Sequence, residues 1–264
     1  MTIGTSIRDN WMTIGTTIRD NWVSYLTKSG ALFAVIYIVS MFLVPAFSGD
    51  WGYVQRVWHN WQSFNVGMLA FLSSVVALNI SIYNATTQKG REFIAARAFL
   101  PEALSDLSAY FNDCAPVLKN AYDRAKNKED KCKTPLKGSI PELPSTYKAT
   151  FTNCIKFSDP DTGDYLANVL VLLQVHHSRI QDLSQNFSED SSTLVLPQNV
   201  MSYIFCLAEL KALVGKAFCF ARGRGQLDDS SLSIDLLHNA YHNLKICVEK
   251  IDGLESLTQA SLER

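Results

Sequence analysis

The stretch VGMLAFLSSVVALNISIY, residues 66–83, decides how the rest of this chain is interpreted. It is the apolar part of a longer segment, 57–88, that contains no Asp, Glu, Lys or Arg. A helix needs about 20 apolar residues to cross a bilayer, so this segment predicts a membrane-spanning helix. A second charge-free segment, 29–49, carries ALFAVIYIVSMFLVPAF at 31–47 and predicts a slightly shorter span before it.

The positive charges around these two segments predict their orientation. Only Arg56 lies between them, and the other nearby basic residues lie outside: Arg8, Arg19, Lys28, Lys89, Arg91 and Arg97. Cytoplasmic flanks of membrane helices are enriched in Lys and Arg, so both termini are predicted to be cytoplasmic. The connection, 48–64, has the aromatic residues typical of a membrane interface: Trp51, Tyr53, Trp58, Trp61 and Phe64.

The first 22 residues consist of two eleven-residue copies, MTIGTSIRDNW and MTIGTTIRDNW, which differ at Ser6 and Thr17. Eleven residues make about three helical turns, so both copies place their apolar side chains on one helical face. Segment 1–28 is therefore predicted to be an amphipathic helix at the membrane interface. The alternative is that one copy is a start-site duplication without a role.

Small side chains recur along one face of the second predicted span: Gly67, Ala70, Ser74, Ala77, Ser81 and Asn84. Such a face allows two helix backbones to approach closely in a membrane, so it predicts self-association through this helix. Asn79 lies off this face, and its amide needs a hydrogen-bond partner if it faces lipid. A homo-oligomer could supply that partner, or the side chain could reach water at the inner interface.

The rest of the chain predicts a cytoplasmic helical domain at 86–264. Apolar residues at alternating spacings of three and four predict helices over about 101–126, 146–157, 166–187, 197–221 and 231–252, with an exposed loop at 127–145. No segment shows the pattern of a strand. The predicted fold is therefore all-α, with a transmembrane helical hairpin at 29–85 followed by an antiparallel helical bundle.

The histidines and cysteines give weak indications of chemistry. His238 and His242 are four residues apart, a spacing that can hold a metal, but no companion ligand is evident and no metal site is predicted. His176 lies on a predicted core stripe beside His177 and is interpreted as a hydrogen-bonded core imidazole. The six cysteines lack a C-x-x-C spacing and are expected to be reduced thiols. No catalytic residue and no cofactor is indicated.

The segment FARGRG, 220–225, is a candidate anion site because Arg222 and Arg224 alternate with two glycines between predicted helices. The alternative is a glycine C-cap with arginines near the negative end of a helix. The glycine spacing fits neither a P-loop nor a dinucleotide fingerprint. Acidic residues dilute the lysines of 119–137 and the formal charge is −1, so no specific nucleic-acid binding is predicted.

Three segments together, WQSFNVGMLAFLSS (61–74), REFIAARAFLPEALSDL (91–107) and FARG (220–223), resemble a group of uncharacterised bacterial membrane proteins with two spans and a helical cytoplasmic tail. The resemblance implies a bacterial inner membrane and no particular activity. The chain is expected to be a non-enzymatic interaction or effector protein that contacts the lipid bilayer, self-associates, and perturbs the membrane in defence or stress. Its helical domain would bind a cytoplasmic protein or a small anionic ligand. The alternative is a membrane-tethered enzyme that uses distant residues of the helical domain, with His176, His238, His242, Arg222 and Arg224 as candidates.

Overall fold

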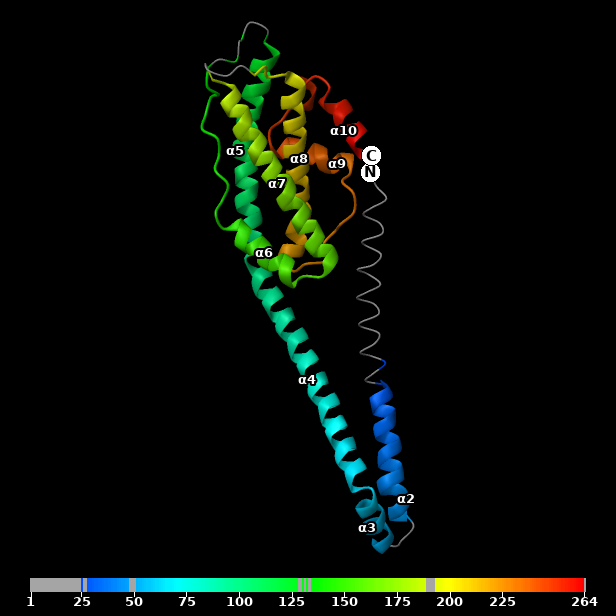
Figure 1. Cartoon of the computed structure of the whole chain (residues 1–264). Coiled ribbons are helices and arrows are strands. Elements are labelled where there is room, and N and C mark those ends of the chain that lie inside the picture. The colour runs from blue at the N-terminus through cyan, green and yellow to red at the C-terminus, as the bar shows by residue number, and fades with distance from the viewer. Residues whose placement is uncertain are drawn as a thin grey trace. The chain divides into compact units, whose positions relative to one another are not determined.

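In the computed structural model, helices and no strands are found in the residues that the structure describes, which are 25, 28–47, 51–127, 130, 132, 134–188 and 193–263 (Figure 1). The predicted all-α class is confirmed for these residues. The chain divides into two compact units, Met1–Thr87 and Gln88–Arg264. The duplication at 1–22, and the interfacial helix predicted from it, lie outside the described residues.

Unit 1 contains an apolar helix followed by several shorter elements and a long helix. The apolar helix Lys28–Met41 leads into a π-helical turn, and the later elements follow in chain order: η1 (Val39–Leu43), α2 (Val44–Phe47), α3 (Trp51–Asn60) and α4 (Gln62–Ala98). Among the described residues, only the helical stretch Gln62–Lys126 is long and apolar enough to cross a membrane. The segment predicted as the first span is therefore helical, but it is not one regular helix of spanning length.

The sequence supplies a physical reason for the irregular first segment. Pro45 has no amide hydrogen, so the Met41 carbonyl lacks the donor that an α-helix would provide four residues later. Trp58 Nε1 of α3 donates to this carbonyl instead, over 3.2 Å. The Val44 amide donates to the Val39 carbonyl, which is the five-residue spacing of a π-helix. The proline thus changes the helix type one turn before itself and leaves an acceptor for the connecting helix.

Two contacts hold the helix Lys28–Met41 against α4. The Tyr37 hydroxyl donates to Asn65 Oδ1 over 3.0 Å, and both side chains are buried. At the other end, a Cβ on Gly30 would lie 3.8 Å from Val75 Cγ2. Residue numbers rise along one helix as they fall along the other, so the two helices are antiparallel.

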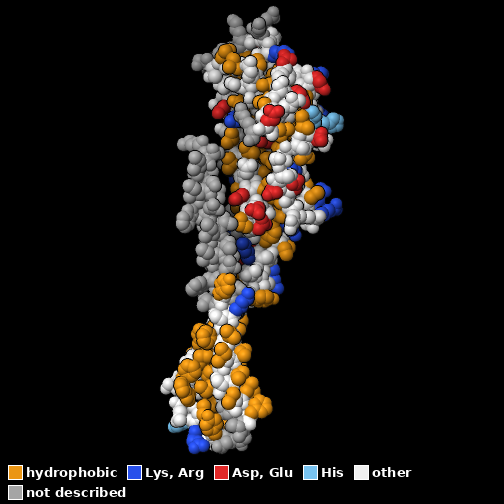
Figure 2. Space-filling model, turned by 90° about the vertical axis from the view of Figure 1, so that its right-hand side faces the viewer, with side chains coloured by type: hydrophobic (Ala, Val, Ile, Leu, Met, Phe, Trp, Pro, Cys, Tyr) orange, Lys and Arg blue, Asp and Glu red, His pale blue; other side chains and the backbone are white. Residues whose placement is uncertain are grey.

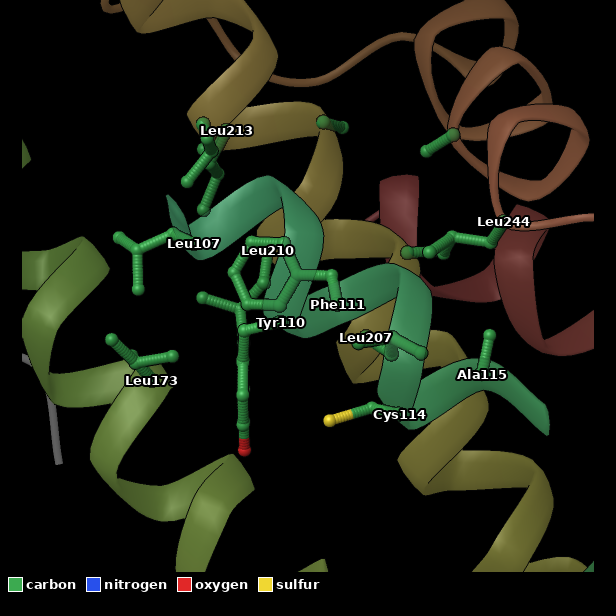
Figure 3. Packing of buried hydrophobic residues seen from close by; sticks show 14 of the residues in the cluster. Leu107, Tyr110, Phe111, Cys114, Ala115, Leu173, Leu207, Leu210, Leu213 and Leu244 are labelled. Atoms are coloured by element: carbon green, nitrogen blue, oxygen red, sulfur yellow. The ribbon is translucent and has the colours of Figure 1, made fainter. Parts of the chain in front are cut away.

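Unit 2 begins with the end of α4 and continues through helices that enclose one hydrophobic core: α5 (Leu100–Lys126), α6 (Tyr147–Phe157), α7 (Pro160–Asn186), α8 (Pro197–Ala221), α9 (Ile234–Asn243), η2 (Val248–Lys250) and α10 (Leu254–Leu262). Helix α8 packs against α5, α7, α9 and α10. Figure 3 shows Leu107 and Phe111 of α5 beside Leu207 and Leu210 of α8. The stripes predicted from three-and-four spacing therefore face one another across this core.

The helix ends of unit 2 follow local sequence signals in most places. Pro160 opens α7, and Asp159 caps it by accepting a hydrogen bond from the Thr162 amide over 3.0 Å. The segment SDPDTGD, 158–164, therefore contains the start of α7, six residues before the helix predicted from position 166. Pro197 opens α8 as predicted.

The helix predicted over 231–252 is wrong, because the structure divides this region into α9, a turn and η2. The amides of Lys245 and Ile246 donate to the carbonyls of His242 and Tyr241, which is the Schellman arrangement that ends a helix. Lys245 takes the left-handed conformation there, with φ +56°. Glycine usually fills this position, so the sequence gives no sign of the break.

Candidate functional site

A cavity of about 690 Å³ lies between α9, η2 and α10. Helix α9 places His238 and His242 on its wall, one helical turn apart. The turn at Lys245 then brings Cys247 and Glu249 to the same cavity. The helix break that the sequence did not predict is therefore what creates this cavity.

Two polar pairs lie on the walls of the cavity. His238 Nε2 is 3.1 Å from Glu255 Oε2 of α10, a distance that suits either a hydrogen bond or an ion pair. The Cys247 thiol donates to Glu249 Oε2 over 3.0 Å. That hydrogen bond to Glu249 raises the pKa of the Cys247 thiol and lowers the pKa of the Glu249 carboxyl. The thiol therefore stays protonated near neutral pH and is a poor nucleophile.

The structure supplies companions for His238 and His242 that the sequence analysis missed, namely Glu255, Glu249 and Cys247. Even so, no three His, Cys, Asp or Glu side chains within the described ranges are arranged to hold a metal ion. The His238–Glu255 pair can instead accept a proton from a molecule in the cavity. No sequence spacing could have revealed this pair, because it depends on the turn at Lys245.

The two adjacent histidines of α7 have different environments. His176 is 1% exposed, and neither of its ring nitrogens has a hydrogen-bond partner, so the prediction of a hydrogen-bonded imidazole is wrong for this residue. Its burial lowers its pKa to about 4 and keeps the ring neutral at pH 7. His177 makes the hydrogen bonds instead, with Nδ1 2.9 Å from the Tyr110 hydroxyl and Nε2 2.9 Å from Gln181 Nε2. Because the Gln181 amide nitrogen can only donate, His177 Nε2 is the acceptor.

The six cysteines form no disulfide. Cys114 and Cys154 are buried, which raises the pKa of their thiols to about 12 and about 11. Figure 3 shows Cys114 beside Tyr110 in the core. Cys219 and Cys247 are exposed, so only part of the set belongs to the core.

The FARGRG segment ends α8 in a glycine C-cap. The Gly223 amide donates to the Phe220 carbonyl over 2.9 Å, and the Arg224 amide donates to the Cys219 carbonyl over 3.0 Å. Gly223 has φ +69°, which a residue with a side chain adopts only at a cost. The capping interpretation of this segment is therefore confirmed. Arg222 and Arg224 are both exposed, and the Arg222 guanidinium carbon lies 5.3 Å from the centroid of the Phe218 ring.

The small-residue face of α4 is exposed along the span: Gly67, Ala70, Ser74, Ala77 and Ser81. It lies opposite the face that carries Asn65 and Val75, which contact the helix Lys28–Met41. Asn79 Nδ2 donates to the Val75 carbonyl over 2.8 Å. The Asn79 amide thus finds a partner on its own helix, an answer that neither alternative in the sequence analysis had included.

Comparison with known proteins gives no match to a family model, a curated protein or a solved structure. The resemblance to two-span bacterial membrane proteins therefore gains no support from these comparisons.

Proposed function

We propose that this chain is a membrane-anchored, non-enzymatic interaction or effector protein of the bacterial inner membrane. The observation that carries the proposal is the surface of α4, because none of its most apolar 18-residue window is buried. Figure 2 shows hydrophobic side chains gathered over unit 1. Apolar surface is favourable to remove from water at about 25 cal/mol per Å², so a lipid bilayer is the solvent that suits this helix.

The helix Lys28–Met41 extends the same argument to a hairpin. Six of its large apolar side chains are exposed although it packs on α4: Leu32, Phe33, Val35, Ile36, Ile38 and Val39. Together with η1 and α2 it continues helically to Phe47, which gives a second membrane segment. The excess of Lys and Arg outside the hairpin supports an orientation with both termini in the cytoplasm.

Self-association through α4 completes the proposed role of unit 1. The small-residue face is left open by the intrachain hairpin. Apart from the adjacent backbone of α4 itself, no atom of the described residues lies within 4 Å of the place where a Cβ on Gly67 would stand. A second copy of α4 could approach closely along this face. An oligomer of hairpins joined in this way would perturb the membrane in defence or stress, while unit 2 senses a cytoplasmic protein or a small anionic ligand.

The topology is tested with reporter fusions at residue 55 and at the C-terminus, which should give opposite compartment signals. Identical signals would rule out the two-span hairpin. The assembly is tested by replacing Ala70 and Ala77 with Leu, which should reduce crosslinking in membranes while insertion persists. The matched control replaces Val76 and Ile80 with Leu, because both are exposed residues outside the small-residue face. A monomeric wild-type chain would reject the assembly.

An enzyme tethered to the membrane is the second candidate, and the His238–Glu255 pair is the observation that favours it. The pair lines a cavity large enough for a small substrate and can act as a proton acceptor. Partner binding or membrane leakage that survives replacement of both His238 and Glu255 with Gln would favour the non-enzymatic role. Loss of the cellular effect with intact assembly would favour the enzyme.

A further inference from the structure

A second cavity of unit 2, of about 360 Å³, is lined by residues of α7, α8, α9 and α10 and of the segment 229–232. Helix α8 contributes Phe205, Glu209 and Leu213, which are four residues apart and therefore share one helical face. Tyr165 of α7 also lines the cavity, and its hydroxyl donates to the Leu213 carbonyl over 2.8 Å. This hydrogen bond fixes α7 against α8 at the cavity wall, and the volume lies within the range of small-molecule sites.

The carboxyl group of Glu209 is an unusual component of this wall. Glu209 is the one acidic residue of α8, and it lies half-buried between the apolar side chains of Phe205 and Leu213. No hydrogen bond or ion pair joins its carboxyl group to another of the described residues. Burial raises the pKa of this carboxyl group, because the ionised form loses part of its hydration. An unpaired carboxyl group on the wall of a cavity is a candidate ligand-binding group.

The two lysines of α8 do not neutralise Glu209. Lys211 Nζ donates to Ser108 Oγ of α5 over 3.1 Å, and Lys216 Nζ lies 3.4 Å from Asp228 Oδ2. Among the residues that the structure describes, no Lys, Arg or His lines this cavity. The other ionisable carboxyl group on its wall belongs to Asp229, which is exposed. The cavity therefore has negative charge that no basic side chain of its wall balances.

The composition of the wall defines the chemistry of a matching ligand. A metal ion is a poor match, because no three His, Cys, Asp or Glu side chains of the described ranges are arranged to hold one. Apolar side chains form much of the remaining wall, among them Phe205, Leu232 and Leu262. A ligand that suits both parts of the wall has one positive charge and a hydrocarbon body.

We infer that this cavity binds a small organic cation, a primary amine with a short hydrocarbon body, and that Glu209 holds its ammonium group. The ammonium donates charge-assisted hydrogen bonds to the Glu209 carboxylate, while the hydrocarbon body displaces water from the apolar wall. The ligand is opposite in charge to the anion expected at Arg222 and Arg224. The inference does not depend on the membrane assignment of unit 1.

The experiment titrates the full chain, in a mild and uncharged detergent, with butylamine and with phenethylamine. Butanol and phenethyl alcohol are the matched ligands, because they have the same bodies without the charge. Saturation-transfer nuclear magnetic resonance measures binding of all four compounds. At least one amine should bind saturably and about tenfold or more tightly than its alcohol, because an alcohol forms no charge-assisted hydrogen bond with the carboxylate. Equal binding of amine and alcohol, or no binding of either amine, overturns the inference.

A glutamate substitution connects the binding to Glu209. Glu209→Gln keeps the size of the side chain and removes its charge, so it should weaken amine binding about tenfold or more. Glu142→Gln is the matched control, because this exposed glutamate precedes α6 and does not line the cavity. Unchanged amine binding by Glu209→Gln, or equal weakening by Glu142→Gln, overturns the inference.

A second substitution tests the cavity itself. Asn168 is an exposed residue of α7 on the cavity wall, and Asn168→Phe reduces the volume without changing the charge. It should weaken the binding of the amines about tenfold or more, because a phenyl ring occupies part of their space. If Glu209→Gln fails to fold by circular dichroism, Asn168→Phe decides. Full amine binding by a folded Asn168→Phe chain overturns the inference.

Membrane anchoring is measured separately, by fractionation of cells that produce the chain. A chain that anchors and binds no amine keeps the membrane proposal and overturns this inference. A chain that binds the amine and stays in the soluble fraction supports the amine site and rejects the membrane proposal.

Discussion

In unit 1 most of the large apolar side chains of α4 are exposed, as far as the structure describes the unit, whereas in unit 2 the apolar stripes of α5, α7 and α8 face one another. Both regions are built from apolar residues at helical spacing, but they differ in how the apolar residues are distributed around the helix. Helix α5 is apolar on one face, as a helix of a water-soluble core must be. Helix α4 is apolar nearly all round over 66–83, which fits a lipid environment.

The polar groups of the two units differ in the same way. In α4, the Ser74 hydroxyl and the Asn79 amide donate to carbonyls four residues earlier on their own helix. In unit 2, the Tyr165 hydroxyl of α7 donates to the Leu213 carbonyl of α8, over 2.8 Å. A helix that satisfies its own polar groups can lie in lipid without a neighbour, whereas the bundle uses its polar groups to fix which helices pack together.

The contrast between the two units predicts its largest effect for substitution of two valines that are equally exposed, one in each unit. Val76 of α4 and Val171 of α7 are each 57% exposed. Val76→Lys should disfavour membrane insertion by about 3 kcal/mol, because it places a charge near the centre of a span. Val171→Lys faces water and should change the stability of unit 2 by less than about 0.5 kcal/mol. Resistance to alkaline carbonate extraction measures the first change and chemical denaturation the second, and equal effects would break the comparison.

The buried imidazole of His176 predicts that the stability of unit 2 depends on pH. The pKa of His176 is lowered to about 4 in the folded chain, from a usual value near 6.5. Between these pH values the unfolded chain binds a proton that the folded chain does not, so stability falls as pH drops from about 6.5 to 4, by up to about 3 kcal/mol.

His176→Leu should flatten this dependence, because it replaces an unpartnered ring with an apolar side chain. Denaturation midpoints at pH 7.5 and 4.5 measure the effect. Ser178→Ala, at an exposed position of the same helix, removes no ionisable group; it is the control and should keep the wild-type slope. An unchanged slope in His176→Leu would show that other groups control the acid sensitivity of unit 2.

The hydrogen bonds of the Arg124 guanidinium test whether polar contacts fix the loops of unit 2. Arg124 Nε donates to Asp130 Oδ2 over 2.7 Å, and its Nη1 donates to the Thr134 carbonyl over 2.9 Å. Arg124→Lys should lower the free energy of unfolding by about 2 kcal/mol, because one ammonium cannot reproduce the fork. Lys126→Met removes the exposed pair with Asp252 and should lower the free energy of unfolding far less than Arg124→Lys does. If both variants lose a similar amount of unfolding free energy, the Arg124 hydrogen bonds contribute no more than a surface ion pair.

The smallest predicted effect concerns the two turns that border the 690 Å³ cavity. Lys245→Gly should raise stability by about 1 kcal/mol, because glycine adopts φ +56° without the steric cost of a side chain. Gly253→Ala should lower the stability by about 1 kcal/mol, because it places a side chain at a position with φ +85°, where only glycine is free of steric strain. Thermal unfolding of both variants measures the pair, and a loss of stability in Lys245→Gly would show that the Lys245 side chain contributes more than the strain costs.

The sequence was informative at the two ends of α8, which a proline and a glycine mark, but it missed the start of α7 at Pro160. Pro197 and Gly223 delimit α8 within a residue or two of its observed ends, because their backbone preferences are local. The end of α9 was missed because Lys245 adopts a glycine-like conformation under tertiary constraint. The turn at Lys245 brings His238 and Glu255 together, so residue spacing in the sequence could not predict this pair. Arg97 was interpreted only as a positive charge beside a predicted membrane span. Its guanidinium approaches Gly223, and sequence spacing cannot reveal a contact between positions 126 residues apart.

The hydrogen bond from Trp58 to the Met41 carbonyl has an optical consequence. All five tryptophans of the chain lie at or before Trp61, so indole fluorescence reports on unit 1 alone, and tyrosine is the aromatic fluorophore that unit 2 adds. Loss of the Trp58 hydrogen bond should shift the indole emission, whereas melting of the bundle should change the far-ultraviolet dichroism. Indole fluorescence and far-ultraviolet dichroism can therefore follow unit 1 and unit 2 separately in one sample.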